Sequence, residues 1–549
     1  MSVAYSRLSK GFADHGADGP VQLPADGRAL KQWLDNLPRG NPKGTAVTLQ
    51  SALAAHLQHA QSGNSRFNQL EQLRETVLDT VLWLERQFMG SPLPMTADRL
   101  QHAQSAQALN NVLADNYRLA CHELCAPEGS IGLLKSGAVT TALERATWHY
   151  QQCLLQSWSL YRGAPPSIWL GLHRVYQFAA SVNVEAKTVT EPVAKKALSV
   201  RTLYIESCLL SLMNPFAFAH RELDLMKALA FGLADSCRIR PDSKAEYTAS
   251  LPIDADLPVD AELPEGEAAG LDFSALQQAL VNAEYAPDGE QVLVRIPAAG
   301  KLELPLSVLK RTLRNFGLAA ARLGKRIPSD YTLQTVCGLS SVHFFAAGQM
   351  DFERYTQKIS QQGSQGLSLA ADWLSMSSDG QSPRSLPAQV IDHSLGGYLL
   401  RWSPDPALRI RVGEVVGLNA MPASNEPDWM LGVVRWLRYE NDGSILAGIK
   451  LLARRCLAVA LRVHTDGHAG SLVRGLELQA LEQGAASSFL WSGKSSEAEV
   501  RVDAHYGYEP YRLTGPRTTE SLMLRPSILS SNMDYTLLVV PSEAVNDAE

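Results

Sequence analysis

The sequence predicts a multidomain α+β protein, with an all-α helical bundle first, a mixed middle segment next, and antiparallel β structure at the C-terminal end. Three observations support this class. Amphipathic helical stripes recur before residue 240, an acidic run broken by prolines follows at 241–270, and short β-rich segments separated by turns fill the last third. A chain of 549 residues has room for about three or four domains.

The helical bundle is expected over residues 1–240. In segment 66–89, apolar residues recur at three- and four-residue steps or their sums, which is typical of one buried helical stripe. Similar patterns predict helices at 98–124, 139–161, 192–213 and 218–236, with a short one near 28–36 in a loose region that ends near 45. Trp169, Leu172 and Tyr176 match the spacing of half a tetratricopeptide repeat, but no period of about 34 residues follows. An irregular bundle that docks protein partners is therefore favoured.

Residues 241–270 combine spaced prolines with like charges, which predicts an extended linker. The middle segment, 271–360, is expected to contain a strand at 292–296 and a helix at 306–323. The run 333–348 fits a buried strand and a helix equally well. The helix has a basic face, interpreted as solvated, with a phosphate or acidic-protein site as the alternative. Its members are Lys310, Arg311, Arg314, Arg322, Lys325 and Arg326.

Composition argues against several classes of protein. A net charge of −6 argues against a nucleic-acid scaffold. No apolar run approaches the roughly 18–20 residues of a membrane span, and residues 1–8 lack a signal-peptide pattern, so we expect a cytoplasmic protein without membrane insertion. The seven cysteines are scattered, which favours reduced, buried thiols.

The sequence also shows no motif typical of a metal site or a catalytic site. The segment 121–125 carries two cysteines and a histidine, but no second ligand pair follows at zinc-like spacing, so helical packing is favoured over a metal site. No nucleophile constellation or phosphate-binding glycine loop stands out. We therefore expect neither an enzyme nor a bound cofactor.

The β half centres on the turn at 390–400, where a polar stretch with two adjacent glycines separates two apolar runs. Further along, Asp442 and Gly443 lie between two β-rich segments, which is a strong hairpin signal because tight hairpin turns need positive φ. Strands at this spacing predict an antiparallel β-barrel at 361–460. Strand-like pieces in 461–549, among them 511–513, predict a second small β unit.

At the turn, the spacing Asp392-x-Ser394-x-x-Gly397 resembles the signature of PilZ domains. The flanking segments 412–418, 432–436 and 447–451 are similar to later strands of that family, so the resemblance covers roughly 365–460. It implies a six-stranded barrel that binds cyclic di-GMP and acts as a signalling adaptor in motility, pilus or exopolysaccharide control.

The resemblance also implies roles for particular residues. Asp392 and Ser394 would contact a guanine, and the glycines Gly396 and Gly397 would allow positive φ and close approach of the backbone. An Arg-x-x-x-Arg motif just before the barrel would bind phosphate and stack on guanine, because a guanidinium can do both.

With the barrel taken to begin at 361, three residues are candidates for the arginine half of the site. They are Arg354 and Lys358, four residues apart, and Arg384, the only arginine between residues 357 and 392. Lysine does not stack as a guanidinium does. Two hypotheses stay open: an adaptor that binds cyclic di-GMP and relays it to protein partners, and a scaffold of the same fold that binds no nucleotide.

Overall fold

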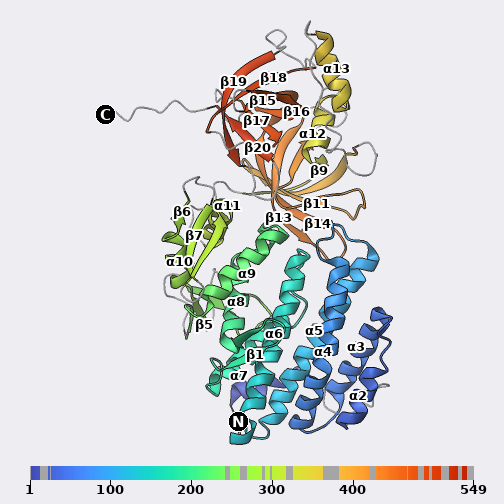
Figure 1. The fold of residues 1–549 in the computed structure, drawn as a ribbon, viewed down its shortest axis with the longest axis vertical. Coiled ribbons are helices and arrows are strands. Elements are labelled where there is room, and N and C mark those ends of the chain that lie inside the picture. The colour runs from blue at the N-terminus through green and yellow to red at the C-terminus, as the bar shows by residue number, and fades with distance from the viewer. Residues whose placement is uncertain are drawn as a thin grey trace, which may run out of the picture. The chain divides into compact units, whose positions relative to one another are not determined.

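The computed structural model describes residues 2–12, 23–24, 26–241, 248–259, 269–286, 291–296, 300–316, 326–362, 383–420, 428–465, 468–479, 487–493, 498–507, 519–528 and 535–540. The chain divides into two compact units, which are drawn in one continuous colour scale in Figure 1. The first unit comprises residues 1–91 and 95–320, and the second comprises 92–94 and 321–549. Each unit is described by itself.

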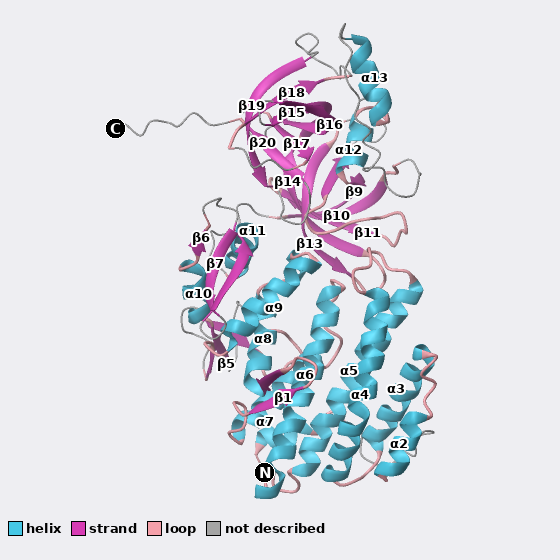
Figure 2. Cartoon of the chain, in the orientation of Figure 1, coloured by secondary structure: helices cyan, strands magenta, loops and turns pink. Residues whose placement is uncertain are grey.

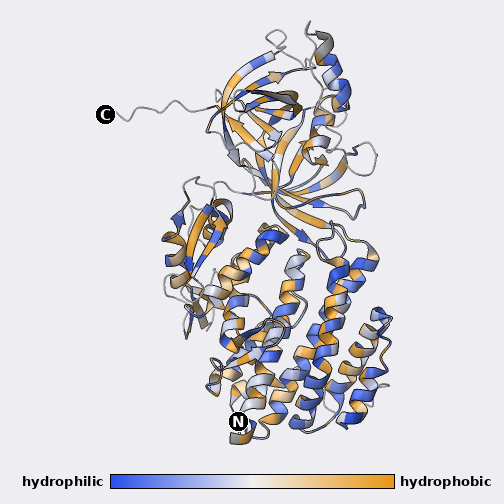
Figure 3. Ribbon diagram, in the orientation of Figure 1, coloured by the Kyte–Doolittle hydropathy of each residue, from blue (hydrophilic) through white to orange (hydrophobic). Residues whose placement is uncertain are grey.

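Helices make up most of the first unit, as Figure 2 shows. They are α1 (Val3–Leu8), α2 (Gly27–Asp35), α3 (Pro42–Gln58), α4 (Gly63–Phe88), α5 (Ala97–Leu124), α6 (Ser136–Ser159), α7 (Ile168–Ser181), α8 (Val200–Leu212) and α9 (His220–Ala234). The helices predicted near 28–36, 66–89 and 98–124 are confirmed, and the stripe residues Leu70, Val77 and Phe88 are buried. Hydrophobic and hydrophilic segments alternate along these helices (Figure 3). Helix α3 begins inside the region that was expected to be loose up to about residue 45.

A β-hairpin replaces the first part of the helix predicted at 192–213. Strands β1 (Thr188–Glu191) and β2 (Lys196–Ser199) pair antiparallel, and α8 begins only at Val200. The buried carboxylate of Glu191 accepts hydrogen bonds from Arg74 at 2.7 Å and Arg145 at 2.6 Å. This contact across long sequence separations fixes the hairpin to the bundle.

The structure also differs from the extended linker expected at 241–270. Strands β3 (Arg238–Arg240), β4 (Thr248–Leu251) and β5 (Ala269–Asp272) form a sheet in the order β3-β5-β4. The Asp256 carboxylate accepts the backbone N–H groups of Ser167 at 2.5 Å and Leu170 at 3.1 Å, at the start of α7. The described part of this acidic segment therefore docks on the N-terminus of a helix, where negative charge is favourable.

The middle segment continues the first unit. It contains α10 (Ser274–Val281), β6 (Glu284–Tyr285), β7 (Gln291–Ile296), β8 (Gly300–Pro305) and α11 (Leu306–Asn315). The strand predicted at 292–296 is confirmed as β7. On the basic helix, Arg311 is not solvated, because it donates to the carbonyl of Ala217 at 2.9 Å and forms an ion pair with Glu222.

The second unit contains two closed antiparallel barrels of six strands each. The first consists of β9 (Ile327–Cys337), β10 (Leu386–Ser394), β11 (Gly397–Trp402), β12 (Val415–Asn419), β13 (Met430–Tyr439) and β14 (Ile445–Ala453). It begins at β9, well before the expected boundary at 361, because helices α12 (Leu339–Ala346) and α13 (Phe352–Gln362) are inserted between its first two strands. The ambiguous run 333–348 is therefore strand to Cys337 and helix after it.

The second barrel follows after a single residue, Arg454. Its strands are β15 (Arg455–Thr465), β16 (His468–Gln479), β17 (Ser488–Ser492), β18 (Val500–His505), β19 (Thr519–Ile528) and β20 (Tyr535–Val539). The predicted second β unit is therefore a complete barrel that begins at Arg455. The piece predicted at 511–513 lies outside the described residues.

Across the described ranges, no helix has both the length and the apolar character needed to cross a bilayer. Within the same ranges, no group of three or more His, Cys, Asp and Glu side chains is arranged to hold a metal ion.

Candidate functional site

The signature residues lie at the hairpin between β10 and β11. Asp392 is paired with Leu399 and Ser394 with Gly397, and the register shifts at a β-bulge between Val390 and Asp392. The Ser394 hydroxyl accepts the N–H of Gly396 at 3.3 Å. Before the bulge, Ala388 and Val390 are buried and Gln389 between them is exposed, whereas Asp392 and Ser394 after it are partly exposed. The hairpin therefore presents their polar groups at the barrel surface.

The two glycines of the turn have different roles. A Cβ atom at Gly397 would lie 2.0 Å from the carbonyl oxygen of Ile449 on β14, whereas one at Gly396 would meet no atom within 4 Å. Neither glycine has a positive φ, so the hairpin does not use the positive φ that glycines would allow. Close approach of the backbone is the reason for glycine at 397 alone.

An arginine lies beside the signature, from a segment predicted to belong to the solvated face of a helix. Arg326 immediately precedes β9, which is the neighbour of β10 in the barrel. Its Nη1 donates to both carboxylate oxygens of Asp392, at 2.6 and 2.9 Å. The Arg326 side chain is 45% exposed and that of Asp392 19%, so both can be reached from solvent.

Arg322 and Arg326 together have the Arg-x-x-x-Arg spacing, directly before the first strand of the barrel. Arg322 lies outside the described residues. The sequence contains this arginine spacing, but the spacing can be recognised as part of the site only when β9 is known to be the first strand of the barrel. The inserted helices α12 and α13 hide that fact, because they separate β9 from β10 along the chain.

The three basic residues predicted from the sequence lie elsewhere. Arg384 is exposed and precedes β10 at the end opposite to Asp392, about 25 Å away along an extended strand. Arg354 and Lys358 are on α13, which the second barrel holds: the Tyr355 hydroxyl donates to the Ala458 carbonyl at 2.7 Å. Arg354 is largely exposed and forms an ion pair with Asp351 at 3.4 Å. The structure pairs Asp392 with Arg326 instead.

The side chain of His393 contacts both β9, which follows Arg326, and β11. Its Nδ1 lies 2.8 Å from the Ser329 hydroxyl on β9, and its ring centroid lies 6.1 Å from Tyr331 and 6.2 Å from Tyr398. Burial raises the pKa of Tyr398 above its usual range, so this phenol stays neutral. The contacts hold the end of β10 against the start of β9, where Arg326 is attached.

Comparison with known proteins adds to this geometry. A family model described as the middle PilZ domain of the cyclic-di-GMP receptor FimW matches residues 259–382 and 373–457, and one described as the N-terminal domain of the same receptor matches residues 28–243. The chain contains a PilZ domain, formed by the first barrel. The PilZ match contains all six strands of the first barrel together with Arg322 and Arg326, and it ends at the start of β15.

A relative of this PilZ protein is the cyclic-di-GMP receptor FimW of Pseudomonas aeruginosa. The two are 26% identical over 474 residues, which cover 77% of this chain and 76% of the relative. The similarity therefore extends well beyond the barrel that carries the signature.

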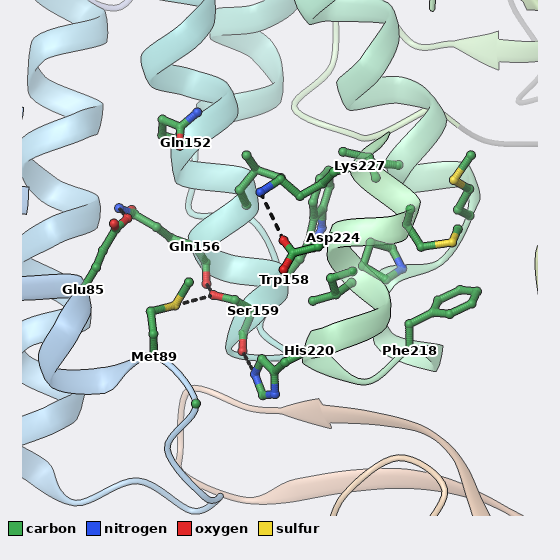
Figure 4. A pocket seen from close by; sticks show the side chains of 17 residues that line it. Glu85, Met89, Gln152, Gln156, Trp158, Ser159, Phe218, His220, Asp224 and Lys227 are labelled. Carbon is green, nitrogen blue, oxygen red and sulfur yellow. Dashed lines mark hydrogen bonds and ion pairs between the residues drawn. The ribbon is translucent and has the colours of Figure 1, made fainter. Parts of the chain in front are cut away.

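The helical unit has a separate cavity of about 310 Å³ between α4, α6, α8 and α9 (Figure 4). Its wall is mainly apolar, with Met89, Trp158, Met213 and Phe218. On the polar side, Gln156 donates to the Glu85 carboxylate at 2.8 Å, and burial raises the pKa of Glu85. A mixed wall of this kind suits an amphipathic side chain or small molecule.

Proposed function

We propose that this PilZ protein is a non-catalytic signalling adaptor that binds cyclic di-GMP at the first barrel, through Arg322, Arg326, Asp392 and Ser394. The observation that carries the proposal is the Arg326–Asp392 pair, because it brings a guanidinium beside the PilZ signature. Gly397 keeps the hairpin close to β14.

The chemistry of the pair suits a cyclic dinucleotide. A guanidinium can donate two parallel bonds to phosphate oxygens and lie flat against a guanine, and a carboxylate can accept the N–H groups of the base. The ion pair itself is worth only about 0–1 kcal/mol, because Arg326 is nearly half exposed. Charge-assisted bonds to the ligand, at about 1.5–3 kcal/mol each, are strong enough to replace it.

Isothermal titration calorimetry with cyclic di-GMP tests the proposal. Loss of one charge-assisted bond in Arg326→Ala is expected to weaken binding by about 10- to 150-fold. Arg326→Lys should recover only part of the affinity, because lysine keeps the charge and loses the planar fork. Asp392→Ala and Ser394→Ala should also weaken binding.

Arg384→Ala and Arg354→Ala are the matched controls, since each removes an exposed arginine away from the signature. Both should bind as the wild type does. If they weaken binding as much as Arg326→Ala, the site is elsewhere. If the wild type shows no binding at high micromolar nucleotide, the scaffold that binds no nucleotide is the better description.

The proposal includes an output through protein partners of the helical unit, in motility, pilus or exopolysaccharide control. Cyclic di-GMP is an intracellular messenger, so a cytoplasmic location belongs to the proposal. The cavity in Figure 4 supports a docking role for the helices, since Met89 both lines it and is 49% exposed. Flexible methionine side chains suit adaptable protein contacts.

Crosslinking in cells followed by mass spectrometry tests the docking role. Met89→Asp should reduce the recovery of bound proteins severalfold. Leu82→Asp is the control, because Leu82 is 48% exposed on α4, which ends directly before Met89, and does not line the cavity. Equal recovery with both variants would contradict docking at the cavity.

A further inference from the structure

The second barrel repeats the strand order of the first. In the first barrel the neighbours run β10-β11-β14-β13-β12-β9 and close again on β10. In the second they run β16-β17-β20-β19-β18-β15 and close on β16. Moving each strand of the first barrel six places along the chain gives every pairing of the second, and all pairs in both are antiparallel.

This correspondence identifies the residues that replace the signature. Ser394 pairs with Gly397, the first residue of β11, and Leu478 pairs with Ser488, the first residue of β17. Leu478 therefore stands at the position of Ser394, and Leu476, two residues earlier, at that of Asp392. Two leucines cannot accept hydrogen bonds from a guanine.

Only part of the arginine half has a counterpart: Arg454, directly before β15, stands at the position of Arg326, whereas the position of Arg322 falls on Lys450 within β14. The first barrel is preceded by the segment that carries Arg322 and Arg326. Strand β15 begins at Arg455, and only Arg454 separates it from the end of β14 at Ala453. A segment of this length cannot fold over a ligand at the β16–β17 hairpin.

The two leucines instead belong to a hydrophobic cluster outside the second barrel. Leu476 and Leu478 are buried together with Val342 of α12 and with Val415 and Leu431 of the first barrel. The interior of the second barrel is a different cluster, which includes Val459, Phe489, Val502 and Leu538. The face that carries the nucleotide signature in one barrel is a packing face in the other.

We propose that residues 455–539 form a second barrel of PilZ topology that has exchanged its nucleotide face for internal packing against α12 and the first barrel. The chain then binds cyclic di-GMP at the first barrel alone, a consequence that rests on the proposed function. The partner of the second barrel's altered face is the chain's own inserted helix and neighbouring barrel.

A double-mutant cycle in the full chain tests the packing face. Leu478→Ala and Val342→Ala remove side chains from the shared cluster, so the shift in denaturation midpoint of the double variant should fall short of the sum of the single shifts. The control cycle pairs Val342→Ala with Leu538→Ala, a leucine of the barrel interior, and its shifts should add. Additive shifts in both cycles would overturn the proposal.

Calorimetry with cyclic di-GMP tests the single site. Asp392→Ala combined with Arg326→Ala should remove all binding. Binding that persists at wild-type affinity would assign a site to the second barrel and overturn the inference. A wild-type chain that binds no cyclic di-GMP would contradict the proposed function, and the cycle would still decide whether the altered face packs against α12.

Discussion

A single backbone contact determines which glycine the β10–β11 hairpin requires. Gly397 lies against the Ile449 carbonyl, whereas Gly396 faces open space and has no positive φ. The PilZ signature specifies glycine at the position of Gly397 and allows any residue at the position of Gly396. Packing thus explains the pattern without reference to a ligand.

Gly397→Ala should therefore destabilise the protein by about 1–3 kcal/mol, the usual cost of forcing an extra carbon into a packed site. Gly396→Ala is the control and should stay within about 0.5 kcal/mol of wild type, as surface changes usually do. Urea unfolding of the two variants measures both values. Equal stability of the two variants would mean that β14 can move away from position 397 without a loss of folding free energy.

Buried carboxyl groups make the helical unit sensitive to pH. Burial raises the pKa of Glu206 on α8 from about 4.5 to about 7, although Gln151 donates a hydrogen bond to it at 3.0 Å. A raised pKa means that ionisation opposes folding. The stability contributed at this residue is full below pH 4.5 and is lost as the pH rises towards 7.

Glu206→Gln should remove this dependence, since a neutral amide oxygen can still accept the bond from Gln151. Relative to wild type, the variant should gain about 2–3 kcal/mol between pH 5 and pH 8. Denaturation curves at the two pH values measure the difference. A constant difference would show that Glu206 titrates normally in the folded protein.

Among the secondary-structure elements, α13 is hydrogen-bonded to the second barrel through Tyr355. The Tyr355 hydroxyl donates to the Ala458 carbonyl at 2.7 Å and accepts the N–H of Gly507 at 2.9 Å, and the side chain is buried. Both backbone groups would be unpaired without it, and buried polar groups are costly to leave unpaired.

Tyr355→Phe is expected to cost about 1–3 kcal/mol per unpaired group, whereas Arg354→Ala on the exposed side of α13 should be nearly neutral. Thermal unfolding followed by circular dichroism compares the two. Neutrality of Tyr355→Phe would mean that water reaches the vacated position.

For the whole molecule, a ligand that binds one unit should stabilise that unit. At a nucleotide concentration of 100 times Kd, binding adds about 2.7 kcal/mol to the stability of the unit that contains the barrels. Hydrogen exchange should show new protection within 321–549 and little change in residues 28–243. Arg326→Ala at the same nucleotide concentration is the control and should lose most of the gain.

The sequence by itself determined the features that local chemistry controls. Helices 66–89 and 98–124 follow from apolar spacing, the β13–β14 hairpin follows from Asp442-Gly443, and the signature at 392–397 identified the PilZ domain. Each of these features depends on residues that are close together in the sequence. Each can therefore be predicted without knowing which distant segments pack against it.

The tertiary structure alone decided the features that depend on distant partners. It closed the first barrel with β9, paired Arg326 with Asp392, docked Asp256 on α7, and gave both barrels one strand order. The two inserted helices separate β9 from β10 in the sequence, so the pairing of these strands is not evident from it. The composition of an acidic segment does not indicate that the segment will bind the N-terminus of a helix. The physical reason is that these contacts gain their energy from groups far apart in sequence, which local periodicity does not record.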